Sequence, residues 1–308
     1  MDERFVTAIV PCLNEEQHIA NCLESIVAQD YPKKYLEVLV MDGGSGDKTR
    51  EIVKQFDVRL LDNPRVSTPA AMNVGIKAAK GEVIIKMDAH TKYSVDYISK
   101  CVQHLQESGA DNVGGVLESA PAKDTLMAKA IAICLSHVFG AGGSHFRTGA
   151  ETPMEVDTVA FGCYKRQVFD RIGLFNEQMA QIEDLEFNYR LRAAGGKIML
   201  FPDIRAQYYP SSTTLSSFFL HNLDDGIWAT YPLKYGFRVS LRHIIPLLFV
   251  LTIVISFWVY IWFALLFAVQ IAVAEKDWRL LYVMPLAFGA RHIGYGVGSI
   301  IGLFKLLN

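Results

Sequence analysis

Short apolar runs alternate with amphipathic stretches through the N-terminal part of the chain. The runs at 5–10 and 37–41 have the length and composition of strands, and the stretch between them carries apolar residues at helical spacing, namely Ile19, Leu23, Ile26 and Val27. The alternation continues with predicted helices near 47–56, 69–79 and 94–108 and predicted strands near 58–61, 82–87 and 112–117. Strands and helices that alternate at these spacings predict a mostly parallel, Rossmann-like α/β sheet covered on both faces.

The pattern is less regular after this region. We expect helices near 124–138, 165–171 and 183–194, strands near 156–163 and 197–201, and a glycine-rich loop at 140–149. The stretch 211–240 is polar, with interleaved aromatic residues at Trp228, Tyr231, Tyr235 and Phe237. This composition suits amphipathic helices at a bilayer surface, and ordinary surface helices are the alternative.

The composition shifts most sharply near residue 243. Residues 244–274 contain no Asp, Glu, Lys or Arg, and a helix of that length would measure roughly 46 Å against about 30 Å for a bilayer's hydrocarbon core. We therefore expect this run to tilt strongly or to fold back within a membrane. A second apolar run at 280–307, interrupted by Arg291 and His292 and rich in glycine, is a weaker spanning candidate. A buried amphipathic helix is the alternative for both runs.

Three parts follow from this pattern: a catalytic domain at 1–210, interfacial amphipathic helices at 211–243, and a membrane domain of two or three helical segments at 244–308. The basic residues just before the first apolar run are Lys234, Arg238, Arg242 and His243. Basic residues there indicate the cytoplasmic side. The charged start of the chain, without the apolar stretch of a secretory signal, agrees. We expect a multi-pass cell-membrane protein with a cytoplasmic catalytic domain.

Charge and cysteine content narrow the class. The formal net charge is −2, with no long run of one sign, so nucleic acid is not an expected partner. The five cysteines are scattered and form no Cys-x-x-Cys pair, which argues against a disulfide framework and against a zinc site.

Polar residues cluster where the predicted strands end, which is where parallel sheets bind ligands. Pro11 to Glu16 follows the first strand, and Asp42 to Asp47 follows the second. The Asp42 carboxylate suits the imide N–H of a nucleobase or the hydroxyls of a ribose. An Asp before Gly-Gly-Ser suits a helix N-cap or a turn equally well.

A later strand ends in Asp88-Ala89-His90. A carboxylate and an imidazole two residues apart can reach one Mg²⁺ or Mn²⁺ beside a diphosphate, where the metal would neutralise the charge that grows on the leaving group. A capping Asp and a surface His are the alternative for this tripeptide.

Two further clusters are candidates for chemistry. Glu183 and Asp184 open a predicted helix, where acidic residues are favoured by the macrodipole, but Asp184 is also placed to accept the proton of an acceptor hydroxyl, with Glu183 orienting it. Arg147, with the backbone N–H groups of the loop around Gly142 and Gly143, is a candidate for holding a second phosphate. A flexible surface loop is the alternative there.

Together, these residues resemble the family 2 inverting glycosyltransferases of GT-A fold. The resemblance rests on the order and spacing of Pro11-x-x-Asn14-Glu15-Glu16, Asp42-Gly-Gly-Ser45, Ala71-x-Asn73-x-Gly75, Asp88-x-His90, Gly114-Gly115 and Glu183-Asp184. The stretches 139–149, 156–162 and 242–246 are similar to the succinoglycan-type subgroup of exopolysaccharide and glycolipid transferases.

The resemblance implies roles for particular residues. Asp42 would contact the nucleotide base, Asp88 and His90 would replace the family's Asp-x-Asp, and Asp184 would be the base of a single displacement with inversion. The implied nucleotide-sugar set is Pro11, Asn14, Glu15, Asp42, Asn73, Asp88 and Gly115. A neutral imidazole at His90 binds hard Mg²⁺ less readily than Mn²⁺.

We therefore expect a metal-dependent hexosyltransferase that uses Mn²⁺ or Mg²⁺. Its donor would be a nucleotide-sugar, with UDP the favoured carrier. Its acceptor would be a hydroxyl of a lipid-linked saccharide at the cytoplasmic face, in polysaccharide or glycolipid synthesis.

Three alternatives have sequence features that weigh against them. A polyprenyl-phosphate sugar transferase usually reads Asp-x-Asp-Leu-Gln, whereas this chain reads Asp-Ala-His-Thr-Lys at 88–92. A processive polysaccharide synthase would carry Gln-x-x-Arg-Trp, whereas Trp228 follows Asp-Asp-Gly-Ile. An inactive membrane scaffold would not need the intact set Asp42, Asp88 and Asp184.

Overall fold

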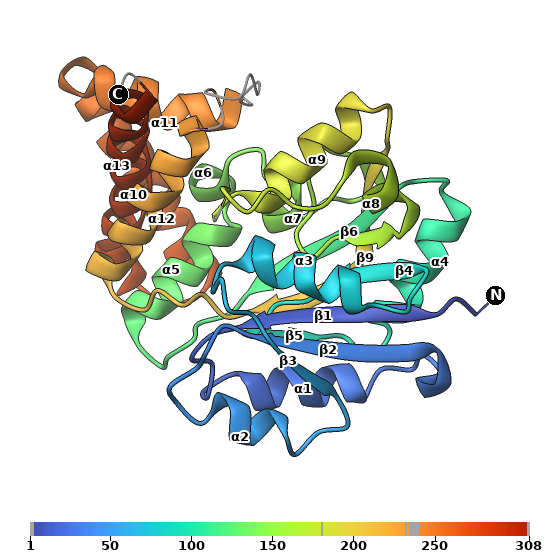
Figure 1. Cartoon of the computed structure of the whole chain (residues 1–308). Coiled ribbons are helices and arrows are strands. Elements are labelled where there is room, and N and C mark those ends of the chain that lie inside the picture. The colour runs from blue at the N-terminus through green and yellow to red at the C-terminus, as the bar shows by residue number, and fades with distance from the viewer. Residues whose placement is uncertain (1–2, 180, 232, 234–240, 307–308) are drawn as a thin grey trace. The chain divides into compact units, whose positions relative to one another are not determined.

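The computed structural model describes residues 3–179, 181–231, 233 and 241–306. The chain divides into two compact units (Figure 1). The first consists of Met1–Glu118 with Gly149–Tyr208, and the second of Ser119–Thr148 with Tyr209–Asn308. The first unit ends close to residue 210, where we expect the catalytic domain to end, and the segment 119–148 belongs to the second unit.

The parallel half of the first unit's sheet forms as the apolar periodicity predicts. Its strand order is β3-β2-β1-β4, with β1 at Val6–Cys12, β2 at Leu36–Asp42, β3 at Arg59–Asp62 and β4 at Val83–Lys86. The connecting helices are α1 at Ile19–Val27, α2 at Thr49–Val53 and α3 at Thr68–Ala78. Right-handed crossovers place α1 and α2 on one face and α3 on the other (Figure 1). A short 3₁₀ turn, Lys33–Tyr35, precedes β2.

Several pairs in the rest of this sheet are antiparallel, so the sheet is mixed and not mostly parallel as predicted. Beyond β4 the strand order continues β8-β6-β9-β5, with β7 beside β9. These strands are β5 at Thr91–Tyr93, β6 at Asn112–Ser119, β7 at Met154–Glu155, β8 at Cys163–Lys165 and β9 at Ile198–Tyr208. Because β8 pairs antiparallel with both β4 and β6, it separates two strands that the alternation of elements places in one parallel series.

The irregular half of the sequence gives the other differences. Most of the strand expected at 156–163 is loop, because Phe161 takes a positive φ of 52° that interrupts extended chain. Helix α4 at Tyr97–Glu107 forms as predicted, and so do α8 at Gln167–Ile172 and α9 at Glu183–Ala193. The glycine-rich stretch contains two short helices, α6 at Val138–Ala141 and α7 at His145–Thr148.

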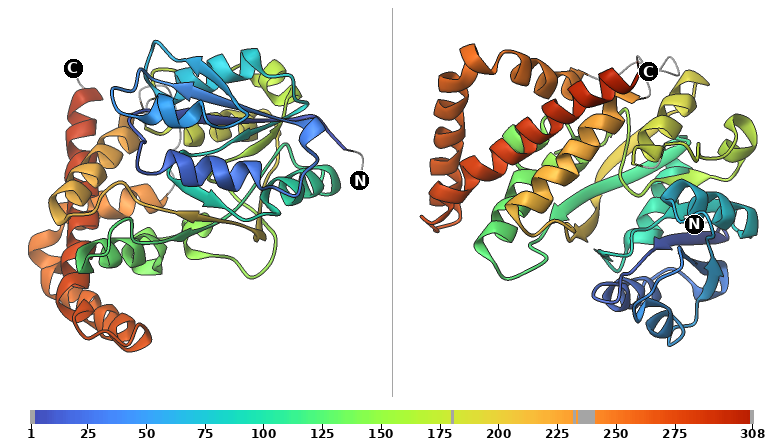
Figure 2. Two further views of the ribbon diagram at one scale, coloured as in Figure 1. Left: turned by 90° about the horizontal axis from the view of Figure 1, so that it is seen from below. Right: turned by 60° about the vertical axis from the view of Figure 1, so that its left-hand side comes forward.

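Helices make up the described part of the second unit. Besides α6 and α7 they are α5 at Leu126–Ser136, α10 at Leu215–Thr230, α11 at Leu241–Leu251, α12 at Ile253–Ala274 and α13 at Leu280–Leu306. Figure 2 shows α10 and α13 side by side. Their backbones approach closely at Gly298, where a Cβ atom would lie 2.0 Å from the Leu223 carbonyl oxygen.

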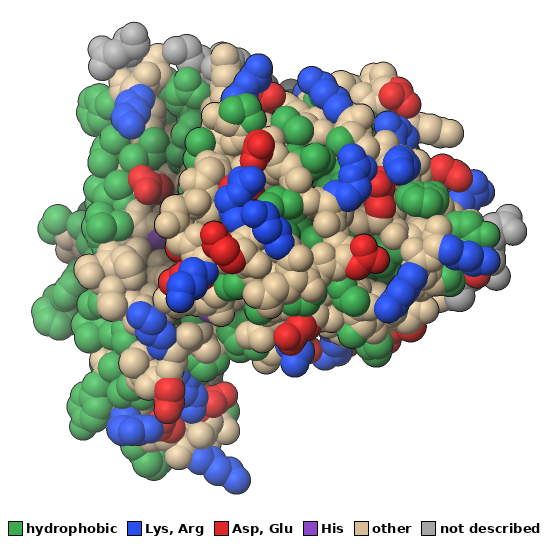
Figure 3. All heavy atoms as spheres, turned by 60° about the horizontal axis from the view of Figure 1, so that its bottom comes forward, with side chains coloured by type: hydrophobic (Ala, Val, Ile, Leu, Met, Phe, Trp, Pro, Cys, Tyr) green, Lys and Arg blue, Asp and Glu red, His purple; other side chains and the backbone are tan. Residues whose placement is uncertain are grey.

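The long uncharged run breaks into two helices at Thr252. That this run tilts or folds back within a membrane stays a prediction. In the described part of the chain, α12 is long and apolar enough to cross a membrane. Its exposed side chains include Val254, Ile255 and Trp258, and Figure 3 shows hydrophobic side chains gathered over the C-terminal helices. The prediction of several membrane-spanning helices is not supported, because α12 is the one candidate among the described residues by length and apolar composition.

Arg291 and His292, which interrupt the second apolar run, are held inside the second unit. Arg291 donates to the Gly140 carbonyl and to the Asn222 side-chain oxygen, and His292 pairs with the Phe139 carbonyl and the Tyr260 hydroxyl. The residues Lys234, Tyr235, Phe237 and Arg238, on which part of the interfacial prediction rests, lie outside the described residues.

Candidate active site

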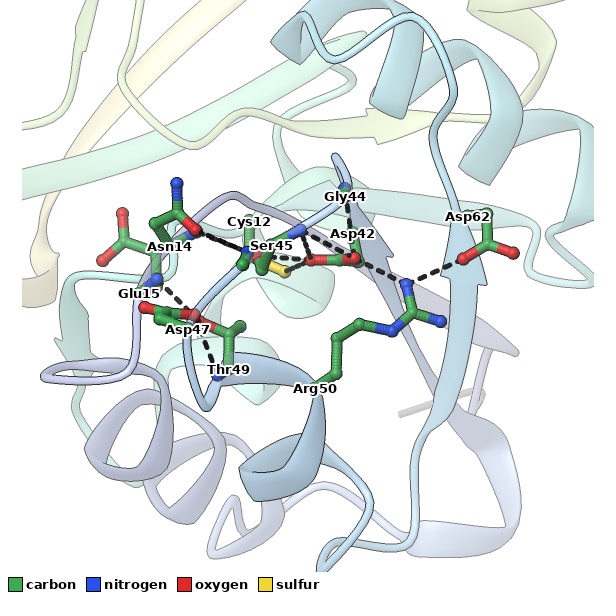
Figure 4. Close-up of polar contacts among 11 residues, drawn as sticks. Cys12, Asn14, Glu15, Asp42, Gly44, Ser45, Asp47, Thr49, Arg50 and Asp62 are labelled. Carbon is green, nitrogen blue, oxygen red and sulfur yellow. Dashed lines mark hydrogen bonds and ion pairs between the residues drawn. The ribbon is translucent and has the colours of Figure 1, made fainter.

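Two loops at the carboxyl ends of β1 and β2 are bonded to each other. The Asn14 backbone N–H donates to Ser45 Oγ at 2.8 Å, and Asn14 Oδ1 accepts from the Gly46 N–H at 2.9 Å (Figure 4). Asn14 has a φ of 55°, a left-handed conformation that Asn tolerates better than most residues. The Glu15 N–H adds a bond to Thr49 Oγ1. The two loops therefore form one frame, which agrees with a nucleotide pocket built from both.

Asp42 is the centre of this frame. Its buried carboxylate accepts hydrogen bonds from the Gly44 and Ser45 N–H groups, from the Ser45 hydroxyl at 2.6 Å, and from Arg50 at 2.6 Å (Figure 4). Burial raises the pKa of Asp42, but the bonds from Ser45 and Arg50 outweigh burial and hold the pKa below its usual value. Arg50 also bonds Asp62. Asp42 thus orders the loop, and its contact with a nucleobase stays a prediction.

A pocket of about 280 Å³ lies at the same edge of the sheet. It brings together residues from β1, β4, α3 and the start of α9, so segments far apart in sequence face one cavity. Its lining residues are Pro11, Cys12, Leu13, Glu15, Asn63, Val66, Thr68, Ala71, Lys86, Met87, Asp88, His90 and Glu183. Five of them, Pro11, Glu15, Asp88, His90 and Glu183, are among the residues that the sequence marks as candidates.

Asp88 and His90 lie in this pocket, with Glu15 beside them. His90 Nδ1 is 3.0 Å from Asp88 Oδ1 and 3.2 Å from Glu15 Oε1. Burial alone would lower the pKa of His90, but the two carboxylates raise it to about 9. The Tyr93 hydroxyl accepts from the Asp88 N–H and fixes the strand end. Nδ1 of His90 therefore lies between the carboxylates of Asp88 and Glu15, and a metal cation can take the place of the proton on this nitrogen.

The donor set fits a divalent metal that is completed by substrate. Among the described residues, no group of three or more His, Cys, Asp and Glu side chains forms a ready metal site. Mg²⁺ and Mn²⁺ commonly take one or two protein ligands and fill the remaining positions with phosphate oxygens and water. One Asp88 carboxylate and one His90 nitrogen, beside a pocket open to ligand, match that arrangement.

Lys86, the last residue of β4, is a functional candidate that sequence reasoning missed. Its side chain is 9% exposed, and Nζ lies 2.6 Å from Glu183 Oε1 and 2.7 Å from Asp184 Oδ2. Removing one partner of a buried ion pair costs roughly 3–5 kcal/mol, because a charge is left uncompensated. The available signal was a lysine inside an apolar strand run, Val83 to Met87.

The two oxygens of Asp184 have different surroundings. Oδ2 is held by Lys86, whereas Oδ1 is buried with no hydrogen-bond partner among the described residues. Glu183 is buried and also accepts a hydrogen bond from Lys86; burial raises the pKa of Glu183, and the Lys86 ammonium opposes this rise. Both carboxylates open α9, where the helix dipole favours negative charge. Asp184 Oδ1 is thus an acceptor that still lacks its donor.

The structure gives packing roles to two predicted donor-binding residues. The Asn73 side chain bonds the backbone of Phe175 on both its amide atoms and reaches Glu177, so it fastens a loop to α3. A Cβ at Gly115 would lie 2.0 Å from the Ile204 carbonyl oxygen, so the close approach of β6 and β9 requires glycine. Their contact with a donor stays a prediction.

The predicted phosphate loop belongs to the second unit. Gly142 has a φ of 59°, and Gly143 has open space around its Cα. Arg147, in α7, places its guanidinium over the Phe146 ring. Their contact with a diphosphate stays a prediction.

An α/β fold with acidic residues at strand ends around a pocket agrees with the glycosyltransferase class that the sequence motifs indicate. The model of glycosyl transferase family 2 matches residues 7–173, and the chain belongs to this family. The resemblance drawn from the sequence motifs is therefore confirmed.

Particular relatives are similar over much of the chain. The dolichyl N-acetyl-alpha-D-glucosaminyl phosphate 3-beta-D-2,3-diacetamido-2,3-dideoxy-beta-D-glucuronosyltransferase of Methanococcus voltae is 27% identical over 98% of this chain and 98% of its own length. The succinoglycan biosynthesis protein ExoA of Rhizobium meliloti is 30% identical over 78% of this chain and 73% of its own length.

A solved structure shares the fold. The mannosyltransferase PcManGT of Pyrobaculum calidifontis, in complex with GDP-Man and Mn²⁺, superposes with a TM-score of 0.64 at 19% identity, covering 98% of this chain and 88% of its own. The GT-A-like architecture is therefore established for this chain, with a mixed sheet.

Proposed function

We propose that this glycosyltransferase moves a sugar from a nucleotide-sugar, with UDP as the favoured carrier, to a hydroxyl of a lipid-linked saccharide at the cytoplasmic face of a membrane. The names of the Methanococcus voltae and Rhizobium meliloti relatives, a dolichyl-phosphate saccharide transferase and a succinoglycan biosynthesis protein, support this acceptor class. The apolar helix α12 supports a membrane location.

The observation that carries the proposal is the pocket in which Asp88 and His90 lie with Glu183, next to Asp184 on the same helix turn. Leaving-group stabilisation and acceptor activation need different residues within reach of one sugar. We assign Asp88 and His90 to the first task. We assign Asp184 to the second, because its Oδ1 is buried and lacks a partner among the described residues.

The chemistry is a single displacement. The acceptor hydroxyl gives its proton to Asp184 Oδ1 while its oxygen forms a bond to the anomeric carbon. The bond from the anomeric carbon to the diphosphate oxygen breaks, and its electron pair leaves with the nucleoside diphosphate. Attack opposite to the leaving group inverts the configuration. General base catalysis of this kind contributes roughly 10² to 10⁴ in rate.

Asp88 and His90 would hold Mn²⁺ or Mg²⁺. When bound, such a cation neutralises negative charge on the diphosphate. The chain's own residues do the rest: the frame around Asp42 and Asn14 orients the nucleotide, and Lys86 and the α9 terminus hold the carboxylates. The Mn²⁺ in the PcManGT complex supports the choice of metal.

The test is a panel of UDP- and GDP-sugars incubated with the full-length protein and Mn²⁺, scored for release of nucleoside diphosphate. One donor should be turned over in preference to the rest, and turnover should rise when lipid-linked saccharides are added. Release from no donor, with nucleotide binding intact, would contradict the proposed activity.

A further inference from the structure

Lys86 contacts two carboxylates, Glu183 and Asp184, and these contacts are not needed to hold β4 in the sheet. It is the last residue of β4, two positions before Asp88, and its ammonium points at the first turn of α9. Two of its three N–H donors are used on two neighbouring carboxylates, Glu183 and Asp184. A lysine is rarely buried unless it is paired in this way. The end of the strand that leads into the metal-ligand candidate therefore also holds the base candidate.

The contact makes the two oxygens of Asp184 unequal. A carboxylate rotates readily about its terminal torsion, so either oxygen would otherwise serve as proton acceptor. Because Lys86 holds Oδ2 at 2.7 Å, the direction of Oδ1 is set, and Oδ1 is the oxygen without a partner among the described residues. Catalytic groups lose much of their effect when they are displaced by about 1 Å.

We propose that Lys86 is a positioning residue that holds Oδ2 of Asp184 and thereby directs Oδ1 at the acceptor hydroxyl. This inference rests on the proposed function, in which Asp184 is the base. Lys86 also lines the pocket, but the role proposed for it is to hold Asp184 and not to bind donor or acceptor. It acts through Asp184, so its removal slows the chemical step and leaves nucleotide binding intact.

A purely structural role for Lys86 gives a different expectation. In that case the ammonium would only neutralise two buried carboxylates, and removing one carboxylate together with Lys86 would restore the balance. The Glu183→Gln substitution supplies this comparison, because the double variant Lys86→Met with Glu183→Gln has the same net charge at the cluster as the natural chain. Asp184 then has no ammonium to hold it.

The experiment compares Lys86→Met, Lys86→Arg, Glu183→Gln and the Lys86→Met/Glu183→Gln double variant. Thermal unfolding checks the fold, calorimetry with UDP and Mn²⁺ checks nucleotide binding, and nucleoside-diphosphate release from the preferred donor gives kcat and KM. Lys86→Met should lower kcat about a hundredfold in both the natural and the Glu183→Gln background, within the range of general base catalysis, with UDP affinity changed less than threefold. Lys86→Arg, which keeps the charge, should recover at least tenfold of the loss.

Equal kcat for Glu183→Gln and the double variant would overturn the positioning role, and so would an unchanged kcat for Lys86→Met. If Lys86→Met does not fold, the double variant and Lys86→Arg decide by the same criteria. Asp184→Asn separates the two proposals. If Asp184→Asn turns over at the natural rate, the proposed role of Asp184 as the base is rejected. If Asp184→Asn is inactive and the double variant is fully active, only the positioning role of Lys86 is rejected.

Discussion

The nucleotide frame around Asp42 and the cluster of Lys86, Glu183 and Asp184 lie in the same unit. They differ in how completely their carboxylate oxygens are hydrogen-bonded. Around Asp42, each carboxylate oxygen accepts from the loop itself or from Arg50. At the start of α9, Asp184 keeps one buried oxygen without a partner among the described residues. Fully bonded networks give rigidity, whereas an incomplete one is poised for a missing partner. The difference supports the proposal that the frame positions the substrate and the cluster reacts with it.

The largest expected effect comes from Asp184→Asn, which removes the base but keeps the shape. We expect kcat to fall roughly a thousandfold, within the range of general base catalysis. UDP affinity should stay within threefold of the natural protein, because the frame around Asp42 is untouched. Rate measurement and calorimetry on one preparation check both. A comparable loss of UDP affinity would erase the contrast between the two regions.

The metal-ligand candidates come next. Asp88→Asn should lower turnover about a hundredfold at fixed Mn²⁺, because an amide is a weaker ligand than a carboxylate for a hard cation. Excess chelator should stop the natural protein, and added Mn²⁺ should restore it. Calorimetric titration with Mn²⁺ in the presence of UDP provides the measurement. Full activity in chelator would remove Asp88 and His90 from this role.

Metal binding should depend on pH through His90. The neighbouring carboxylates raise the pKa of His90 from its ordinary value to about 9, and a metal binds the neutral imidazole. Below pH 9 each lower unit should therefore weaken Mn²⁺ binding about tenfold. Mn²⁺ titrations at pH 7, 8 and 9 with saturating UDP measure how the affinity changes with pH. His90→Gln is the control, and most of this pH dependence should be lost in it. A flat profile in the natural protein would show that His90 is no ligand.

The smallest effect is expected in the nucleotide frame. Asp42→Asn leaves Arg50 without one of its two carboxylates and weakens the order of the loop. The donor KM should rise about tenfold, equivalent to roughly 1.4 kcal/mol, with kcat nearly unchanged. The matched control is Glu51→Gln, because Glu51 is an exposed acidic residue on α2, the helix that carries Arg50. A large fall in kcat with constant KM would assign Asp42 to the chemistry.

The sequence predicted the part of the fold in which local patterns decide. The first four parallel strands and their helices follow from apolar periodicity. Both faces of β1, β2 and β4 are largely buried, whereas β3 is a more exposed edge strand. Strand direction beyond β4 was not predictable, since the period of apolar residues is the same in parallel and antiparallel strands. The family model confirms the family that the motif order predicted.

The sequence predicted the site residues that belong to motifs at strand ends. It did not predict the residues whose role depends on contacts with distant parts of the chain. Pro11, Glu15, Asp88, His90 and Glu183 line one pocket, as expected from strand ends that meet at one edge. Lys86 was missed because its partners lie about a hundred positions away in the chain, on α9. The packing role of Asn73, whose amide bonds the Phe175 backbone, was also missed, and its contact with a donor stays a prediction.

The stereochemistry of transfer tests the central claim most directly, because it depends on a base and a diphosphate acting on opposite faces of one sugar. With an α-linked nucleotide-sugar, proton NMR of the glycoside product gives the anomeric configuration, which is retained because a glycoside does not mutarotate. We expect the β anomer, in the natural protein and in slow variants alike. A first-formed α product would contradict a single displacement assisted by Asp184.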